Sequence, residues 1–169
     1  MIEMKVMGIA LDTRTGSPIV VLNDLENRRA LPIWIGSSEA SSIIRKIENI
    51  EVMRPMTHDL VCTIIEETGY TLDRVEIHDV SEDTYFANLL LINDEGQELI
   101  IDSRPSDAIA LALRAECPIF VTANVVADGT ISTNRSKDDK EKEDFHNFIQ
   151  NLKPSDFKKL IDDANESDQ

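Results

Sequence analysis

DSRPSDAIALALR, residues 102–114, joins the end of an apolar strand to the start of an apolar helix. Proline suits the first turn of a helix, so we expect the helix to open at Pro105, with Asp107 near the positive end of its dipole. These rules do not explain Arg104, a cation at that positive end. Nor do they explain Asp102, a carboxylate at the end of an apolar strand, which we expect to be partly buried. The cluster is therefore either an ion-pair network or a functional site.

The patterns outside this stretch define the rest of the fold. Apolar alternation between turn residues predicts strands at 2–11, 18–23, 30–36, 72–80, 84–93, 98–102 and 118–121. Apolar residues at helical spacing predict two further helices, over 37–50 and 54–69. We therefore expect an α+β domain over residues 1–131, in which helices cover a mixed, mainly antiparallel sheet.

The helix at 54–69 begins like the helix after Pro105. RPMTHDL (54–60) again places an arginine and a proline before a hydroxyl residue, an aspartate and an apolar helix. Thr57 is the expected N-cap and Gly69 the expected end. The residues expected on its buried face are Leu60, Val61, Ile64 and Ile65. Two helix N-termini that each follow an arginine would form an anion pocket if they converged, which the sequence does not reveal.

The C-terminal part differs in character from the domain. Residues 132–144 are charged without an apolar pattern, which is typical of a linker. Residues 145–169 contain two short apolar stripes on either side of Pro154, which predicts a helical hairpin. Each stripe is too short to form a stable helix alone, so we expect this hairpin to dock on the domain or on another molecule.

Composition limits the possible partners and locations. The formal net charge is −15, so the surface repels nucleic acid at long range, and any phosphate chemistry would need a few local arginines or a bound cation. No apolar run reaches the length of about 20 residues that a membrane span needs. The two cysteines are too few for a disulfide framework. We therefore expect a cytoplasmic protein that does not enter a membrane.

The third predicted strand, ALPIWIG (30–36), is apolar on both faces. Leu31, Ile33 and Ile35 alternate with Pro32 and Trp34, so both faces need cover. A partner element or a partner subunit should therefore lie over Trp34, and we expect a homo-oligomer built on a dimer.

Four motifs together resemble the bifunctional nuclease domain family. They are LPIWIGSSEA (31–40), RPMTHDL (54–60), DSRPSDAIALALR (102–114) and ECPIFV (116–121), and the resemblance covers residues 2–131. It implies a homo-oligomeric α+β nuclease that cleaves DNA and RNA with little sequence preference. The motifs select eight positions of this sequence: Glu39, Arg54, His58, Asp59, Asp102, Arg104, Ser106 and Asp107.

The chemistry of phosphodiester cleavage suggests roles for these positions. The reaction needs an activated water, neutralised charge in the transition state and help for the leaving oxygen. The expected catalytic residues are His58, Asp59, Asp102, Arg104 and Asp107. The expected substrate-binding residues are Arg54, Arg104 and Ser106. Oxygen ligands favour magnesium or manganese, and the expected metal ligands are Asp102, Asp107 and Glu39.

Structural roles are open for the same residues. Glu39 fits the third position of a helix that begins behind Gly36, where a carboxylate stabilises the helix end. His58 could be an exposed residue of a first helical turn. On this interpretation the chain is a non-catalytic, acidic, homo-oligomeric binding or regulatory module. The missing basic surface favours the module, and the ordered family motifs favour the nuclease.

Overall fold

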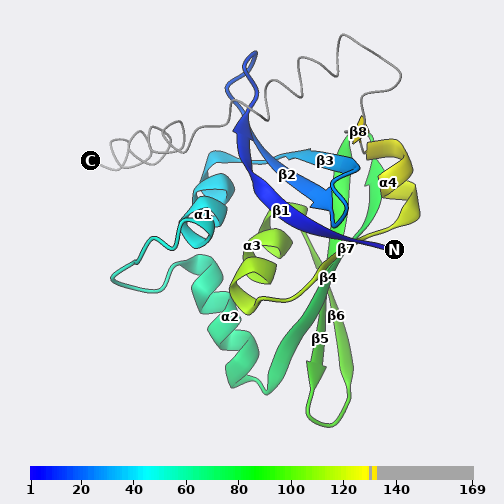
Figure 1. Ribbon diagram of the computed structural model, residues 1–169. Helices are drawn as coiled ribbons and strands as arrows, with labels where there is room; N and C mark the ends of the chain where they lie inside the picture. Colours follow the sequence, from blue (N-terminus) through cyan, green and yellow to red (C-terminus); the bar gives the residue numbers. More distant parts are fainter. Residues whose placement is uncertain (130, 133–169) are drawn as a thin grey trace.

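The computed structural model describes residues 1–129 and 131–132 (Figure 1). Its strands are β1 (Ile2–Leu11), β2 (Pro18–Asp24), β3 (Arg29–Trp34), β4 (Tyr70–Ser81), β5 (Thr84–Asn93), β6 (Glu98–Ser103), β7 (Ile119–Val121) and β8 (Ile131–Ser132). Its helices are α1 (Ser37–Ile47), α2 (Thr57–Glu67), α3 (Pro105–Ala115) and α4 (Ala123–Gly129). The predicted linker beyond Ser132 and the predicted hairpin at 145–169 lie outside the described residues.

The strands form one mixed sheet in the order β6-β5-β4-β7-β1-β2-β3-β8. The pairing of β4 with β7 is parallel, and the other pairings among the described strands are antiparallel. This topology confirms the predicted α+β class. The short β8 and the helix α4 were not predicted from the sequence.

Three helices pack beside one another on the sheet, and α3 is the central one (Figure 1). It contacts both α1 and α2, and it lies against β4 and β5. Seven of its eleven residues are buried, because small alanines let it approach its neighbours while Ile109 and Leu111 fill the core. α3 therefore fixes the place of its own N-terminus, where the polar cluster of the sequence lies.

Helix α2 differs from its prediction in two ways. It begins at Thr57, with Met56 rather than Thr57 as the N-cap, because the Asp59 carboxylate accepts a hydrogen bond from the Met56 backbone N–H at 2.8 Å. Ile65 is buried as expected, but Leu60 and Ile64 are each 52% exposed. The predicted helical period was correct, but the predicted buried face was too wide. Helix α3 packs on one flank of α2 only, so the other flank stays exposed.

Two predicted turns are confirmed. Gly69 follows the end of α2 with a φ of 80°, and Gly96 lies in the β5–β6 hairpin with a φ of 77°. Both positions need the left-handed backbone that glycine adopts without steric cost.

Trp34 lies at the end of β3 and is 56% exposed. Its indole N–H donates a hydrogen bond to an Asp12 carboxylate oxygen at 3.2 Å. Ala10, Ile19, Val21 and Ala30 form a second buried cluster of the β1–β3 strands. The described part of the chain thus leaves Trp34 largely uncovered, and the homo-oligomer inferred from it remains a prediction.

Candidate functional site

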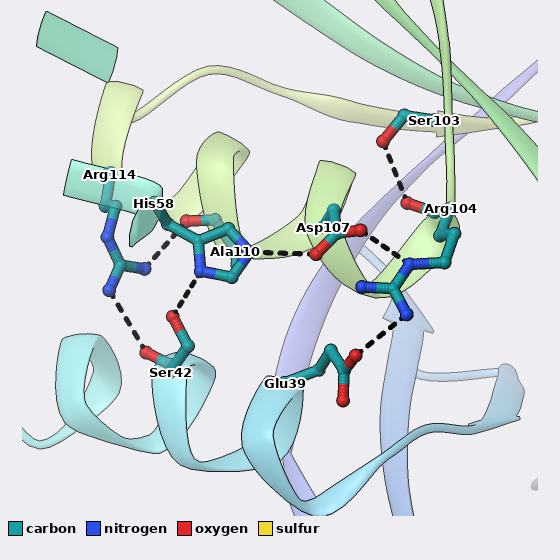
Figure 2. A network of polar contacts seen from close by, with 8 residues as sticks. All are labelled: Glu39, Ser42, His58, Ser103, Arg104, Asp107, Ala110 and Arg114. Carbon is teal, nitrogen blue, oxygen red and sulfur yellow. Dashed lines mark hydrogen bonds and ion pairs between the residues drawn. The ribbon is translucent and has the colours of Figure 1, made fainter. Parts of the chain in front are cut away.

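The N-terminal turns of three helices meet in one polar network (Figure 2). Glu39 is the third residue of α1, His58 the second of α2 and Asp107 the third of α3. Arg104 is the N-cap of α3. The convergence of the two Arg-Pro helices, which the sequence left open, is therefore present at His58 and Asp107.

His58 is held from both sides of its ring. Its Nε2 lies 2.9 Å from Asp107 Oδ1, and its Nδ1 lies 2.8 Å from the hydroxyl of Ser42 on α1. A carboxylate only accepts hydrogen bonds, so Nε2 carries a proton in this arrangement. The Ser42 hydroxyl can donate to Nδ1 of a neutral His58 or accept from Nδ1 of a protonated one. Both hydrogen bonds are therefore compatible with a neutral or a protonated His58 ring.

Arg104 connects two carboxylates of different helices. Its Nε donates to Asp107 Oδ2 at 2.7 Å, and its Nη1 lies 2.8 Å from Glu39 Oε1. The side chain of Arg104 is 65% exposed, whereas that of Glu39 is 16% exposed. The guanidinium thus keeps a solvent-facing side at the end of the network.

Contacts within the network shift the pKa values of Asp107 and Arg104. Burial alone would raise the pKa of Asp107, but the hydrogen bonds and positive charges of Arg104 and His58 outweigh burial and lower that pKa. The hydrogen bond and charge of Asp107, followed by the charge of Glu39, raise the pKa of Arg104. Asp107 is therefore an anion, and Arg104 a cation, throughout the neutral range.

A second ion pair, between Arg114 and Asp59, lies beside the network. Arg114, at the last turn of α3, donates to Asp59 Oδ1 at 2.6 Å and to the Ala110 and Ser42 carbonyl oxygens at 2.9 and 3.3 Å. Burial would raise the pKa of Asp59, but the Met56 N–H and Arg114 lower it. Asp59 therefore anchors α2 to α3.

The sequence did not reveal Ser42 and Arg114 as members of this network. Ser42 follows Glu39 by three residues, so the two share a helix face. Arg114 follows Asp107 by seven residues, two helical turns along the same face. Both spacings were readable, but the sequence does not show which helix faces meet.

The remaining predicted site residues lie outside this network. Asp102 on β6 is exposed rather than partly buried, because β6 is the edge strand and its register pairs Asp102 with Asn88 of β5 alone. Arg54 is exposed in the segment before α2. Ser106 is only 7% exposed and lies in the packed side of α3. Glu39, His58, Arg104 and Asp107 are therefore the predicted site residues that the fold brings together.

The arrangement suits a guanidinium better than a metal ion. Arg104 already pairs with Glu39 and Asp107, two of the three predicted metal ligands. The third, Asp102, is not part of the network. Over residues 1–129 and 131–132, no group of three or more His, Cys, Asp and Glu side chains is placed to hold a metal ion.

No helix in the same part of the chain is long and apolar enough to cross a membrane.

Comparison with known proteins places the chain among its relatives. It is 34% identical over 164 residues to an uncharacterised protein of Mycobacterium tuberculosis (strain H37Rv), a match that covers 92% of this chain and 98% of the relative. It is 29% identical over 124 residues to bifunctional nuclease 2 of Oryza sativa subsp. japonica, covering 71% of this chain and 38% of that protein. Bifunctional nuclease 1 of Arabidopsis thaliana is 28% identical over 113 residues, or 61% of this chain and 35% of that protein. The family model of the bifunctional nuclease domain matches residues 20–134, and the chain belongs to this family.

Proposed function

We propose that this protein is a nuclease that hydrolyses phosphodiester bonds of DNA and RNA with little sequence preference. Its family and the names of its plant relatives support this assignment. The observation that supports nuclease activity at particular residues is a pair of contacts. His58 lies 2.9 Å from Asp107, and Arg104 lies 2.7 Å from Asp107. A histidine, its orienting carboxylate and an exposed guanidinium are the groups that phosphate hydrolysis can use.

In the proposed reaction Arg104 binds the scissile phosphate. Its solvent-facing side meets one oxygen and neutralises the charge that grows as water attacks phosphorus. Asp107 holds the His58 ring in place through the contact with Nε2. Water attacks phosphorus as the P–O bond to the leaving oxygen breaks. His58 either accepts a proton from the attacking water or, when protonated, donates one to the leaving oxygen, and solvent water carries the other proton. His58 would have to turn from Ser42 to do so, because both its ring nitrogens are occupied in the described arrangement.

Magnesium or manganese dependence is a separate proposal. A divalent cation at Glu39 and Asp107 would have to displace Arg104, and a bound ion would supply positive charge for the phosphate. The oxygen-rich residue set supports it, and the present pairing with Arg104 does not. Cleavage measured with Mg²⁺, with Mn²⁺ and with excess chelator tests this proposal apart from the residue roles.

One observation favours a second function. Glu39, His58, Arg104 and Asp107 are each paired within the network, as in a structural ion-pair cluster. In a non-catalytic, acidic binding or regulatory module, this network would only hold three helices together. The two functions make different predictions for the same variants.

The test is cleavage of single-stranded RNA and DNA by purified protein. We expect His58→Gln to lose cleavage by roughly 10²-fold or more, the size typical of a lost general acid or base. His78→Gln is the matched control, since His78 lies on β4 and is not part of the network. If both variants cleave like the wild type, the activity comes from a contaminant or another site, and the binding module becomes the better assignment.

A further inference from the structure

Ser42 places a buried hydroxyl on an otherwise apolar helix face. It is 4% exposed. The other buried residues of α1 are Ala40, Ile43 and Ile44. Burying a hydroxyl costs free energy unless it forms a hydrogen bond. The Ser42 hydroxyl lies 2.8 Å from His58 Nδ1, and Arg114 donates to the Ser42 carbonyl oxygen at 3.3 Å (Figure 2). Ser42 is therefore fixed by α3, with its hydroxyl on the histidine ring of α2.

The two partners of His58 determine which ring nitrogen can take up a proton. Asp107 is an anion in the neutral range and only accepts hydrogen bonds, so Nε2 carries a proton whether the ring is neutral or charged. The neutral ring therefore has its lone pair on Nδ1, where the Ser42 hydroxyl donates to it. A histidine acts as a base through that lone pair. Nδ1 is thus the nitrogen whose protonation changes.

The same two contacts fix the orientation of the His58 ring. The last torsion of a histidine side chain is broad and roughly two-fold, so a single partner leaves the ring room to turn. A half-turn would place ring carbons against both Asp107 and Ser42 and break both hydrogen bonds. The His58 side chain is only 14% exposed, so water replaces these bonds poorly. Ser42 therefore narrows the ring to one orientation.

We propose that Ser42 is a positioning residue of the nuclease site, which fixes Nδ1 as the proton-accepting nitrogen of His58 and sets the direction in which it points. This inference rests on the proposed function. Ser42 is buried and acts through His58, without meeting the substrate. When the ring turns for the reaction, Nε2 can stay on Asp107 while Nδ1 leaves the Ser42 hydroxyl. The bond to Ser42 then defines the resting position from which each turnover starts.

The first experiment compares the kinetics of cleavage of single-stranded RNA by Ser42→Ala and Ser41→Ala. Ser41 is the matched control, because it is partly exposed and lies roughly 100° away around the same helix. We expect Ser42→Ala to lower kcat by about tenfold or more with little change in KM. A misplaced proton acceptor slows the chemical step but leaves phosphate binding at Arg104 intact. Ser42→Thr keeps the hydroxyl and should recover most of the loss. A wild-type kcat in folded Ser42→Ala overturns the proposal.

The second experiment does not require a Ser42 variant to fold. NMR of the full chain, labelled with ¹⁵N, shows which nitrogen of a neutral imidazole carries the proton. The chain has three histidines, and the signals of His58 are those that disappear in His58→Gln. In alkaline buffer, where an imidazole is neutral, we expect the proton of His58 on Nε2.

The outcomes separate this inference from the proposed function. A neutral His58 with its proton on Nδ1, in a protein that cleaves RNA, overturns the role of Ser42 and leaves the nuclease assignment standing. A wild type that cleaves neither RNA nor DNA overturns the proposed function, and with it this role of Ser42, whichever nitrogen carries the proton.

Discussion

Helices α2 and α3 are both eleven residues long, and both follow an Arg-Pro pair. In α3 the proline is the first helical residue and Arg104 is the N-cap, so the arginine is held at the polar network. In α2 the helix begins two residues after Pro55, and Arg54 stays exposed outside the network. The same dipeptide therefore places its arginine in two different environments.

The two helices differ as much in burial. α3 lies in the middle of the helix layer, whereas α2 lies at its outside (Figure 1). Seven residues of α3 are buried, against Ile65 alone in α2. Position in the layer, rather than the local sequence motif, therefore decides how much of each helix is buried.

The largest expected effect is on folding. Ile109→Ala in α3 should lower the free energy of unfolding by roughly 2–5 kcal/mol, because Ile109 is fully buried and its truncation leaves a cavity. Ile64→Ala in α2 should cost much less in the monomer, because the side chain is half exposed. Urea denaturation at low protein concentration measures both, and equal losses would contradict the contrast between the two helices.

The next effect is on cleavage. Arg104→Lys keeps the charge but cannot bridge Glu39 and Asp107 with the planar guanidinium geometry, so cleavage should fall by roughly 10²-fold. The exposed ion pairs should contribute less than about 1 kcal/mol, so the melting temperature should barely change. Arg28→Lys is the control and should cleave normally, because Arg28 is a similarly exposed arginine whose ion pair with Glu26 lies outside the network. A large fall in melting temperature with normal activity per folded molecule would make Arg104 structural.

A third comparison uses the aspartates at the third position of each helix. Asp59→Asn should cost roughly 1–3 kcal/mol of stability, because it leaves the buried guanidinium of Arg114 without its carboxylate partner. Asp107→Asn should cost less stability and more activity, since Arg104 can turn to solvent. Thermal melts and cleavage rates on both variants would sharpen the distinction, and the opposite ranking would place Asp59 in the chemistry.

The smallest effect is on pH dependence. The folded-state pKa of Asp107 lies below its usual value of 3.8. Stability from the ionised Asp107 is therefore fully present above that value and is lost as pH falls through the lowered pKa. Wild type and Asp107→Asn should differ in unfolding free energy near neutral pH, and the difference should shrink below pH 3.8. If the difference in unfolding free energy stayed constant through that acidic range, the charge of Asp107 would not contribute to stability.

Much of this protein was readable from local sequence rules. Strand β5 and the start of α3 at Pro105 lie where alternation and proline predicted them. The motifs also named four members of the polar network, Glu39, His58, Arg104 and Asp107. The expectation that Asp102 is partly buried was wrong, since β6 is at the sheet edge and leaves Asp102 exposed.

The sequence by itself determined strands β1 to β7, helices α1 to α3, their period and the family, because these depend on the spacing of neighbouring residues. Only the tertiary structure decided that residues 42, 58 and 107 share hydrogen bonds and that Leu60 and Ile64 face outward. Burial and contact depend on which elements pack together, and a helical period is the same whether a flank meets a neighbour or water. The exposure of Leu60 and Ile64 on α2 and the polar network between α1, α2 and α3 therefore both follow from the order of the helices on the sheet.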